Sequence, residues 1–404
     1  MPKLKTIGWT SRSSTFGKSR TSFVWILACS FVFFLAACAP PRLSSPATPP
    51  TVAAAPTLSP PAASTVYPTV TPFFTDTPAT TAVPPTAIPL TATPAHIGPQ
   101  PILEIPLDGP AQSSRAEFSG MAWYGDFLVL LPQYPDRFGS GDGAFFVLDR
   151  AEIEAFVDGT LAGPLTPRLL PVDAPGLRGH FPGYQGLESI AFDGERVYLT
   201  VETKPTSAMM GWILAGRVEP DLSVLHIDLT SAVAIPPQAD INNLTDEAIV
   251  LWGSGDDANL LTIYEANGRL INSQPVAHRF AADLTPLAPL PFPPVEYRIT
   301  DTTPADEAGR FWAINYFYPG DVKLKADSDP LLRLIIRNLP QVERLVEFQI
   351  GDGSVHFSNT PPVYLQLLAD DARNWEGIVR LGERGFLLVT DAHPRTILAF
   401  VAKP

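Results

Sequence analysis

Acidic and small polar residues recur at one position of a repeated pair of short apolar strands. The first strand of each pair begins at Ser119, Glu188, Glu247, Asp306 or Glu376. The second strand ends at Gln133, Glu202, Glu265, Asn315 or Asp391. Crowded carboxylates raise one another's pKa or require a cation, and calcium prefers six to eight oxygen ligands. A cation held by such residues can polarise a phosphoester or ester and activate water for its hydrolysis.

We predict that Glu188, Glu247 and Glu376 share one divalent cation, with Ca²⁺ as the first choice. Glu202 and Asp391 are predicted to complete its ligand set. Taken singly, each of these acids is an ordinary solvent-facing residue, as most Asp and Glu are. Their return at one phase of the repeat carries the prediction.

Two basic residues follow the last of these acids. His393 or Arg395 is predicted to stabilise the leaving group or the oxyanion of the hydrolysed ester. They are therefore the candidate catalytic residues of the metal site.

The strand pairs that carry these residues predict an all-β fold. They recur about every 60 residues, which is typical of a radial array of small sheets, a β-propeller. In a propeller the first strand of each blade lines the central channel and the second runs back antiparallel to it. The acids at both positions should therefore meet at one face. Five copies are countable and the length also fits six blades, so five and six both remain open.

Turn residues and chain ends predict how the blades are bounded. Asp193-Gly194 marks the turn between the two strands of the second copy, and Asn267-Gly268 predicts a hairpin into a strand over 269–271. Helical periodicity is confined to 151–157 and 331–337. The last copy lacks a fourth strand, and residues 101–106 are predicted to supply it, which closes the ring and removes exposed edges.

The N-terminal residues predict where in the cell the protein is located. Residues 1–37 contain Lys and Arg but no acid, and they end in an apolar run too short for a comfortable spanning helix, which is typical of a signal peptide. The run closes on Leu35-Ala36-Ala37-Cys38, which resembles a bacterial lipobox and implies cleavage before Cys38 and lipidation of its sulfur. The alternative is a chance cysteine. We expect an extracytoplasmic lipoprotein, anchored to the bacterial membrane through Cys38 on the cell surface or the periplasmic side.

A long stretch of low complexity follows the cysteine. Residues 39–100 contain 16 Pro and 13 Thr with one acid and one base. Such a composition cannot bury a core, so 38–100 is predicted to be the lipidated Cys38 and a disordered stalk. The remaining residues, 101–404, are predicted to form a single propeller domain. Its sequence has no cysteine, so its core must hold it together.

The charge of that domain excludes one class of partner. Residues 101–404 contain 40 acids against 22 bases, a formal net charge of −18. Phosphate backbones attract basic faces, so nucleic acid is not expected as a partner. We expect a monomer that binds a small ester or phosphoester.

Several phrases of the repeat resemble the propeller family named for esterase-like activity of phytase. The resemblance spans nearly all of 101–404, and it implies a secreted propeller with calcium-assisted phosphoester or ester hydrolysis. The chain departs from the family at Gln133, where an acid is usual, and in the fourth copy, which has lost its leading Glu. The phrases are Phe118-Ser119-Gly120-Met121-Ala122, Gly186-Leu187-Glu188-Ser189-Ile190-Ala191-Phe192, Tyr198-Leu199-Thr200-Val201-Glu202 and Trp375-Glu376-Gly377-Ile378 with Leu388-Val389-Thr390-Asp391.

Other functions remain open from the sequence. The motifs of serine hydrolases with a nucleophile elbow, of zinc proteases and of P-loop nucleotide hydrolases are missing. A non-catalytic binding or scaffold propeller, displayed on its stalk, is the main alternative to a hydrolase, and a lactonase-like propeller is the third. Propellers host enzymes, binders and scaffolds alike, so the fold alone does not choose among them.

Overall fold

The computed structural model describes residues 98–331, 341–369 and 371–404. The predicted signal peptide, Cys38 and the stalk lie outside the described residues, as does most of the helix predicted over 331–337. No helix within the described ranges is long and apolar enough to cross a membrane.

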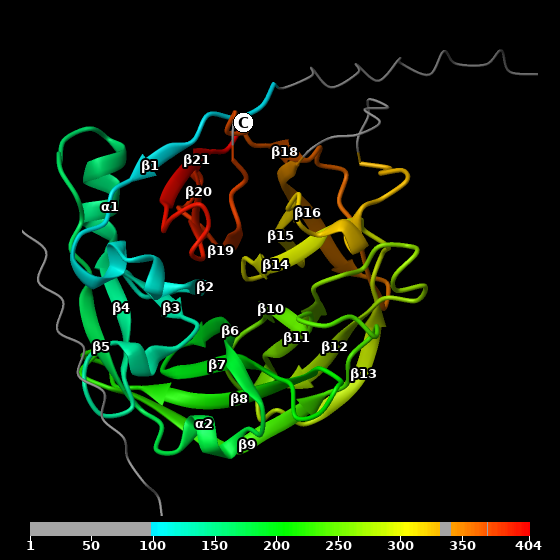
Figure 1. Ribbon diagram of the computed structural model, residues 1–404, viewed down its shortest axis with the longest axis horizontal. Coiled ribbons are helices and arrows are strands. Elements are labelled where there is room, and N and C mark those ends of the chain that lie inside the picture. The colour runs from blue at the N-terminus through cyan, green and yellow to red at the C-terminus, as the bar shows by residue number, and fades with distance from the viewer. Residues whose placement is uncertain (1–97, 332–340, 370) are drawn as a thin grey trace, which may run out of the picture. The chain divides into compact units, whose positions relative to one another are not determined.

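Twenty of the strands form five four-stranded blades around one axis (Figure 1). From the axis outward, blade 1 is β2 (Phe118–Tyr124), β3 (Phe127–Pro132), β4 (Ala144–Asp149) and β5 (Arg168–Asp173). Blade 2 is β6 (Tyr184–Asp193), β7 (Arg196–Thr203), β8 (Met210–Val218) and β9 (Leu225–Ile235). Blade 3 is β10 (Asp246–Trp252), β11 (Asn259–Tyr264), β12 (Val276–Ala281) and β13 (Pro286–Pro291).

Blade 4 is β14 (Arg298–Thr302), β15 (Arg310–Phe317), β16 (Val342–Gly351) and β17 (Ser354–Phe357), with the short β18 (Val363–Tyr364) also pairing with β16. Blade 5 is β19 (Trp375–Arg380), β20 (Gly385–Thr390), β21 (Leu398–Ala402) and β1 (Leu103–Ile105). The innermost strands β2, β6, β10, β14 and β19 contact one another in a closed circle. The all-β propeller prediction is confirmed, and the described residues form five blades rather than six.

Strand β1 closes the ring, as predicted. It pairs antiparallel with β21 from the other end of the domain, with Leu103 opposite Phe400 and Ile105 opposite Leu398 (Figure 1). Without β1 the outer edge of blade 5 would present unpaired backbone groups of β21. The first and last described strands are thus neighbours in space.

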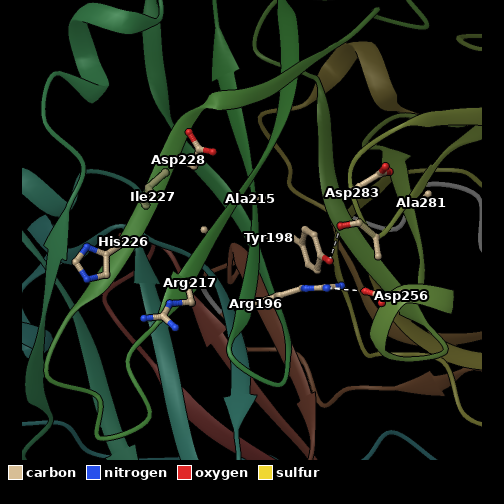
Figure 2. A pocket seen from close by; sticks show the side chains of 12 residues that line it. Arg196, Tyr198, Ala215, Arg217, His226, Ile227, Asp228, Asp256, Ala281 and Asp283 are labelled. Carbon is tan, nitrogen blue, oxygen red and sulfur yellow. Dashed lines mark hydrogen bonds and ion pairs between the residues drawn. The ribbon is translucent and has the colours of Figure 1, made fainter.

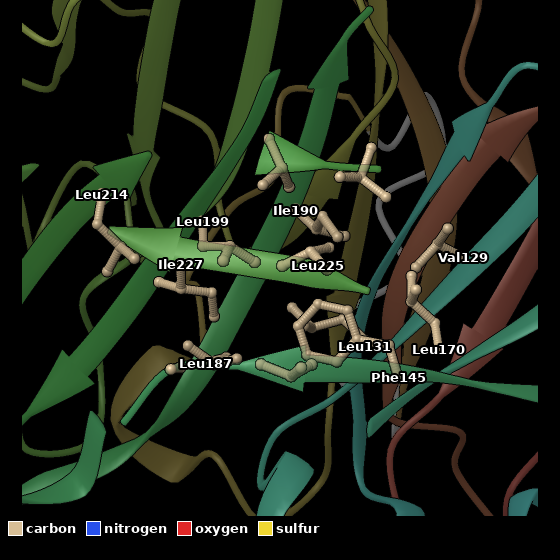
Figure 3. Packing of buried hydrophobic residues seen from close by; sticks show 14 of the residues in the cluster. Val129, Leu131, Phe145, Leu170, Leu187, Ile190, Leu199, Leu214, Leu225 and Ile227 are labelled. Carbon is tan, nitrogen blue, oxygen red and sulfur yellow. The ribbon is translucent and has the colours of Figure 1, made fainter. Parts of the chain in front are cut away.

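The core lies between the blades. Val129 and Leu131 of β3 face blade 2, where they pack with Ile190 and Leu199 (Figure 3). Their neighbours Leu128 and Leu130 face the other way, into the cluster shared with blade 5. Because both faces of a blade are buried, its second strand is a continuous apolar run rather than an alternating one.

The turns and helices agree with the prediction in part. The turn at Asp193-Gly194 is confirmed, and the helix predicted over 151–157 is α1 (Arg150–Val157). The strand predicted over 269–271 is wrong, because the chain turns at Gly268 and β12 begins only at Val276. The remaining helices are short: α2 (Leu177–His180), η1 (Gly109–Gln112), η2 (Ser114–Ala116), η3 (Pro135–Arg137), η4 (Gly255–Asp257) and η5 (Val322–Leu324).

Candidate functional site: the acidic mouth of the channel

One end of the central channel gathers the predicted carboxylates. The strand pairing brings the start of each inner strand beside the end of the next strand, for example Gly186 opposite Glu202 and Trp375 opposite Thr390. A cavity of about 320 Å³ opens there. It is lined by Ser119, Gln133, Glu188, Glu202, Glu247, Arg298, Glu376, Asp391 and His393, together with Glu117, Phe118, Tyr134, Gln185, Asn243, Tyr318 and Asn374.

In four of the five inner strands, a β-bulge directs one side chain toward this mouth. The pairing register slips between Phe118 and Gly120, between Leu187 and Ser189, between Asp246 and Ala248, and between Trp375 and Gly377. The residues passed over are Ser119, Glu188, Glu247 and Glu376. A bulge re-aims the side chain of its extra residue, and bulges are common beside active sites. Four blades therefore present the same irregularity to the cavity.

Glu188 is held by its neighbours in blade 1. Its Oε1 accepts a hydrogen bond of 3.1 Å from the Gln133 side-chain amide. Gly186 makes the approach possible, because a Cβ there would lie 2.2 Å from the Gln133 Cγ and the φ angle is +150°. Burial first, and then the charge of Glu202, raise the pKa of Glu188 well above its ordinary value. Its surroundings therefore favour the neutral form of the Glu188 carboxyl.

Glu376 occupies the corresponding position in blade 5. The Tyr316 hydroxyl donates to its Oε1 at 3.0 Å and also contacts the Asn374 side chain. Burial raises the pKa of Glu376 well above its ordinary value, and the charge of Asp391 adds to the effect. These surroundings therefore favour the protonated form of the Glu376 carboxyl.

Glu247 and Glu265 form a carboxyl pair in blade 3. Burial and the charge of Glu265 raise the pKa of Glu247, and the charges of Glu376 and Glu188 raise it further. Glu265 contacts the Arg298 guanidinium, while its second oxygen has no hydrogen-bond partner among the described residues. Burial is the largest effect and raises the pKa of Glu265, while the charge of Arg298 opposes that shift.

Glu202 is the carboxyl closest to its titration point at neutral pH. It is 3% exposed, and its Oε2 lies 3.4 Å from the Thr245 hydroxyl. Burial first, and then the charge of Glu265, raise its pKa to about 7. The two protonation states of Glu202 are therefore close in free energy near neutral pH.

The two predicted catalytic residues, His393 and Arg395, lie in different places. The backbone N–H of His393 donates to Asp391 Oδ1 at 2.7 Å, and both side chains line the cavity. Arg395 instead pairs with Glu104 of β1 at 2.7 Å and is not among the lining residues. Of the two, only His393 is placed to meet a ligand at the mouth.

The fourth blade departs from the predicted ring. Asp306 was expected at its inner-strand position, and this is wrong, because Asp306 lies after β14 in the turn to β15 and pairs with Arg310 at 3.0 Å. The mouth position belongs to Arg298, the first residue of β14. The register slip of β14 falls deeper, at Thr300 and Asp301. Asp301 is buried in the channel and accepts a hydrogen bond of 2.8 Å from the Ile378 N–H.

The predicted cation can be tested against this donor set. Within 98–331, 341–369 and 371–404, no group of three or more His, Cys, Asp or Glu side chains is placed to hold a metal ion. A calcium ion needs six to eight oxygens around one point. In this arrangement the carboxyl groups do not surround one point closely enough to supply six to eight ligands to a calcium ion.

A second, larger cavity of about 770 Å³ lies between blades 2 and 3 (Figure 2). Arg196, at the opposite end of β7 from Glu202, pairs there with Asp256 at 2.6 Å. The Tyr198 hydroxyl donates to the Ala282 carbonyl at 2.8 Å. These polar groups connect the two blades to each other. The carboxyl groups predicted as the functional site line the channel mouth instead.

Comparison with known proteins gives a likeness of fold only. No family model and no curated protein matches the chain. Among solved structures, a GH43 endo-arabinanase from Bacillus licheniformis is 10% identical, with 74% of this chain and 95% of that chain covered and a TM-score of 0.39. The catalytic domain of a Coprinopsis cinerea GH62 α-L-arabinofuranosidase is 7% identical, with 76% and 96% covered and a TM-score of 0.41. The Bacillus subtilis arabinanase Arb43A is 9% identical, with 70% and 92% covered and a TM-score of 0.41.

These comparisons correct the predicted family. The resemblance to the family named for esterase-like activity of phytase is wrong, because the structures similar to this chain are named as glycoside hydrolases. The phrases behind that resemblance are short, and bulged inner strands of a propeller explain their recurrence without common descent.

Proposed function

We propose that this propeller is a hydrolase that cleaves a glycosidic bond of a neutral carbohydrate at the acidic mouth. One observation carries the proposal: a single cavity is lined by Glu188, Glu247 and Glu376, whose pKa values are raised by burial, and by Glu202, whose pKa is raised to about 7. Carboxyl groups whose environments separate their pKa values supply the general acid and the general base of one reaction. Glycoside hydrolysis is a reaction that uses a pair of carboxyl groups in these two roles.

Glu376 is the general acid of this proposal. Burial keeps its carboxyl protonated, and the Tyr316 hydroxyl fixes its orientation at 3.0 Å. A group of this kind can give its proton to the oxygen that bridges two sugar units. The bond between that oxygen and the anomeric carbon then breaks.

Glu202 is the general base. It comes from blade 2, which is not adjacent to blade 5 in the ring, so the acid and the base lie on different walls of the cavity. Glu247 of blade 3 lines the same cavity, and the charges of Glu376 and Glu202 both raise its pKa. Glu202 takes a proton from a water molecule whose oxygen attacks the anomeric carbon. Exchange with solvent protons then restores both carboxyl groups.

The charge of the cavity favours a neutral substrate. Six carboxyl groups and one guanidinium line it, and the domain carries a net charge of −18. An anionic phosphoester would be repelled unless a cation came with it. The ester or phosphoester substrate predicted from the sequence, with Ca²⁺ as cofactor, is therefore the second candidate, and the experiment below includes it.

The test is a panel of chromogenic substrates: nitrophenyl glycosides, nitrophenyl acetate and nitrophenyl phosphate, each with calcium and with chelator. We expect hydrolysis of at least one neutral glycoside, unaffected by chelator. Glu376→Gln and Glu202→Gln should each lower kcat by about 10²- to 10⁴-fold, because each removes a proton-transfer group. Glu195→Gln, on an exposed acid at the opposite end of blade 2, is the matched control and should leave kcat unchanged.

The pH profile gives an independent check. Activity should rise as pH increases through about 7, because Glu202 must lose its proton to act as a base. Glycoside hydrolysis that persists in both Glu variants would contradict the assignment. Calcium-dependent cleavage of phosphate or acetate alone would favour the second candidate, and no cleavage at all would favour a binding propeller.

We also propose that the domain works at a membrane surface. The lipobox-like residues before Cys38 and the Pro- and Thr-rich stalk support this address. A stalk of this composition reaches at most about 3.1 Å per residue in its extended form. It would let the domain meet carbohydrate well away from the anchoring bilayer.

A further inference from the structure

The mouth of the channel contains one positive side chain that the proposed reaction does not use. Arg298 begins β14 and stands where blades 2, 3 and 5 present Glu188, Glu247 and Glu376. It lines the same cavity, and its side chain is 16% exposed. Blade 4 therefore adds a positive charge to a ring in which three other blades each supply a glutamate.

Two acids hold Arg298 in place. Its Nε donates to Asp321 Oδ2 at 2.6 Å and its Nη2 to Asp321 Oδ1 at 3.0 Å, which is a bidentate pair. Its Nη1 contacts Glu265 Oε1. A bidentate fork fixes the plane of the guanidinium, so this charge cannot swing away from the mouth.

The backbone around Arg298 is fixed as well. The Asn315 side-chain amide donates to the Arg298 carbonyl at 2.9 Å. The next residue, Ile299, donates its N–H to the Glu265 carbonyl at 2.9 Å. Arg298 and Glu265 are therefore tied through both backbone and side chains, across the border between blades 3 and 4.

The charge of Arg298 acts on the ring beyond its direct partner. It favours the ionised forms of Glu202, Glu265 and Glu376. A divalent cation at the channel mouth would have the same influence on these groups. The guanidinium is permanently charged, so its effect does not depend on metal supply or on pH.

We propose that Arg298 is the resident counter-ion of the carboxyl ring, a positioning residue that stands in for a divalent cation. The inference goes beyond the proposed reaction, because it concerns what balances the charge of the ring and not which bond is cleaved. It also explains why the carboxyl groups as placed form no group able to hold a metal among the described residues. Removing Arg298 should convert the mouth into a site that needs a cation.

The experiment measures thermal unfolding of the folded domain in millimolar CaCl₂ and in EDTA. The wild type should melt at the same temperature in both. Arg298→Gln should melt lower in EDTA and regain about 2–5 °C in calcium, because an ion that binds only the native state stabilises it. Arg298→Lys keeps the charge and should show little response to calcium.

Two further variants keep the test decisive. Arg310→Gln removes the Asp306 partner at the other end of the same hairpin and should acquire no calcium response. If Arg298→Gln does not fold, the double variant Arg298→Gln/Glu265→Gln should fold without calcium, since it removes the uncompensated carboxylate as well. The proposal is overturned if calcium stabilises the wild type as strongly as Arg298→Gln, if Arg298→Gln folds but ignores calcium, or if the double variant does not fold.

Discussion

At the scale of single residues, burial and mutual repulsion raise the pKa values of the crowded acids at the mouth. Glu188, Glu247 and Glu376 are buried together, and burial is the largest cause of the raised pKa of each. Glu265 instead contacts the Arg298 guanidinium. The mouth therefore combines carboxyl groups of raised pKa with a fixed positive charge.

The first prediction concerns Glu202 and pH. Its pKa of about 7 in the folded protein lies above the ordinary value of 4.5, so the native state binds this proton more tightly than the unfolded state. Its contribution to stability is complete below about pH 4.5 and is lost as pH rises through about 7. At about 1.4 kcal/mol per pKa unit, up to about 3 kcal/mol should disappear across this window.

Urea unfolding across that pH range measures the effect. The free energy of unfolding should fall less steeply with pH in Glu202→Gln than in the wild type, because Gln does not titrate. Glu195→Gln, an exposed acid of the same blade, should keep the wild-type slope. Equal slopes in all three proteins would show that Glu202 titrates at its ordinary pKa.

At the scale of elements, the inner strands position the chemistry and the closing strand secures the ring. The bulges of β2, β6, β10 and β19 release one residue each from regular pairing and direct it to the mouth. The channel strands must hold one another at close range for this to work. A Cβ on Gly377, for example, would lie 3.1 Å from the Met121 Cγ of the neighbouring blade.

The second prediction compares two apolar residues of β1. Ile105 is 1% exposed and packs in the cluster between blades 5 and 1, whereas Leu103 is 42% exposed. Ile105→Ala should lower the free energy of unfolding by about 2–5 kcal/mol through lost burial and a cavity. Leu103→Ala, on the same strand, should cost less than about 1 kcal/mol.

Chemical denaturation of both variants measures the loss in the free energy of unfolding. A larger loss for Ile105→Ala supports closure of the ring by β1, because only a docked strand distinguishes its two faces. Similar small losses for both would mean that β1 is not packed in solution and that the outer edge of blade 5 is open.

At the scale of the whole molecule, net charge and the N-terminal segment set where the protein can act. A domain with 40 acids and 22 bases is poorly suited to anionic polymers and is not drawn to an anionic membrane by its own surface. We therefore expect membrane attachment through the residues that precede the domain. The lipobox-like residues before Cys38 are the feature that can supply it.

The third prediction tests this attachment. Cys38→Ser removes the sulfur that would carry the lipid, so the variant should leave the membrane fraction or accumulate as the unprocessed precursor. Fractionation followed by mass measurement of the N-terminal peptide distinguishes the two outcomes. Cys29→Ser, in the predicted leader, is the matched control and should stay attached. Membrane retention and normal processing of Cys38→Ser would contradict lipid anchoring through Cys38.

The sequence by itself determined the all-β propeller, the strand that closes it and most of the acids at its mouth. Both signals are local: apolar runs of strand length between turn residues, and acids at a constant phase of the repeat. The tertiary structure decided the rest. The mouth position of blade 4 is occupied by Arg298 and not by Asp306. The inner strand is the segment that pairs with β15, and this segment begins at Arg298 and ends before Asp306. The tertiary structure also decided that the pKa of Glu202 is raised to about 7, since burial and Coulomb interactions depend on distances between blades that no single strand encodes.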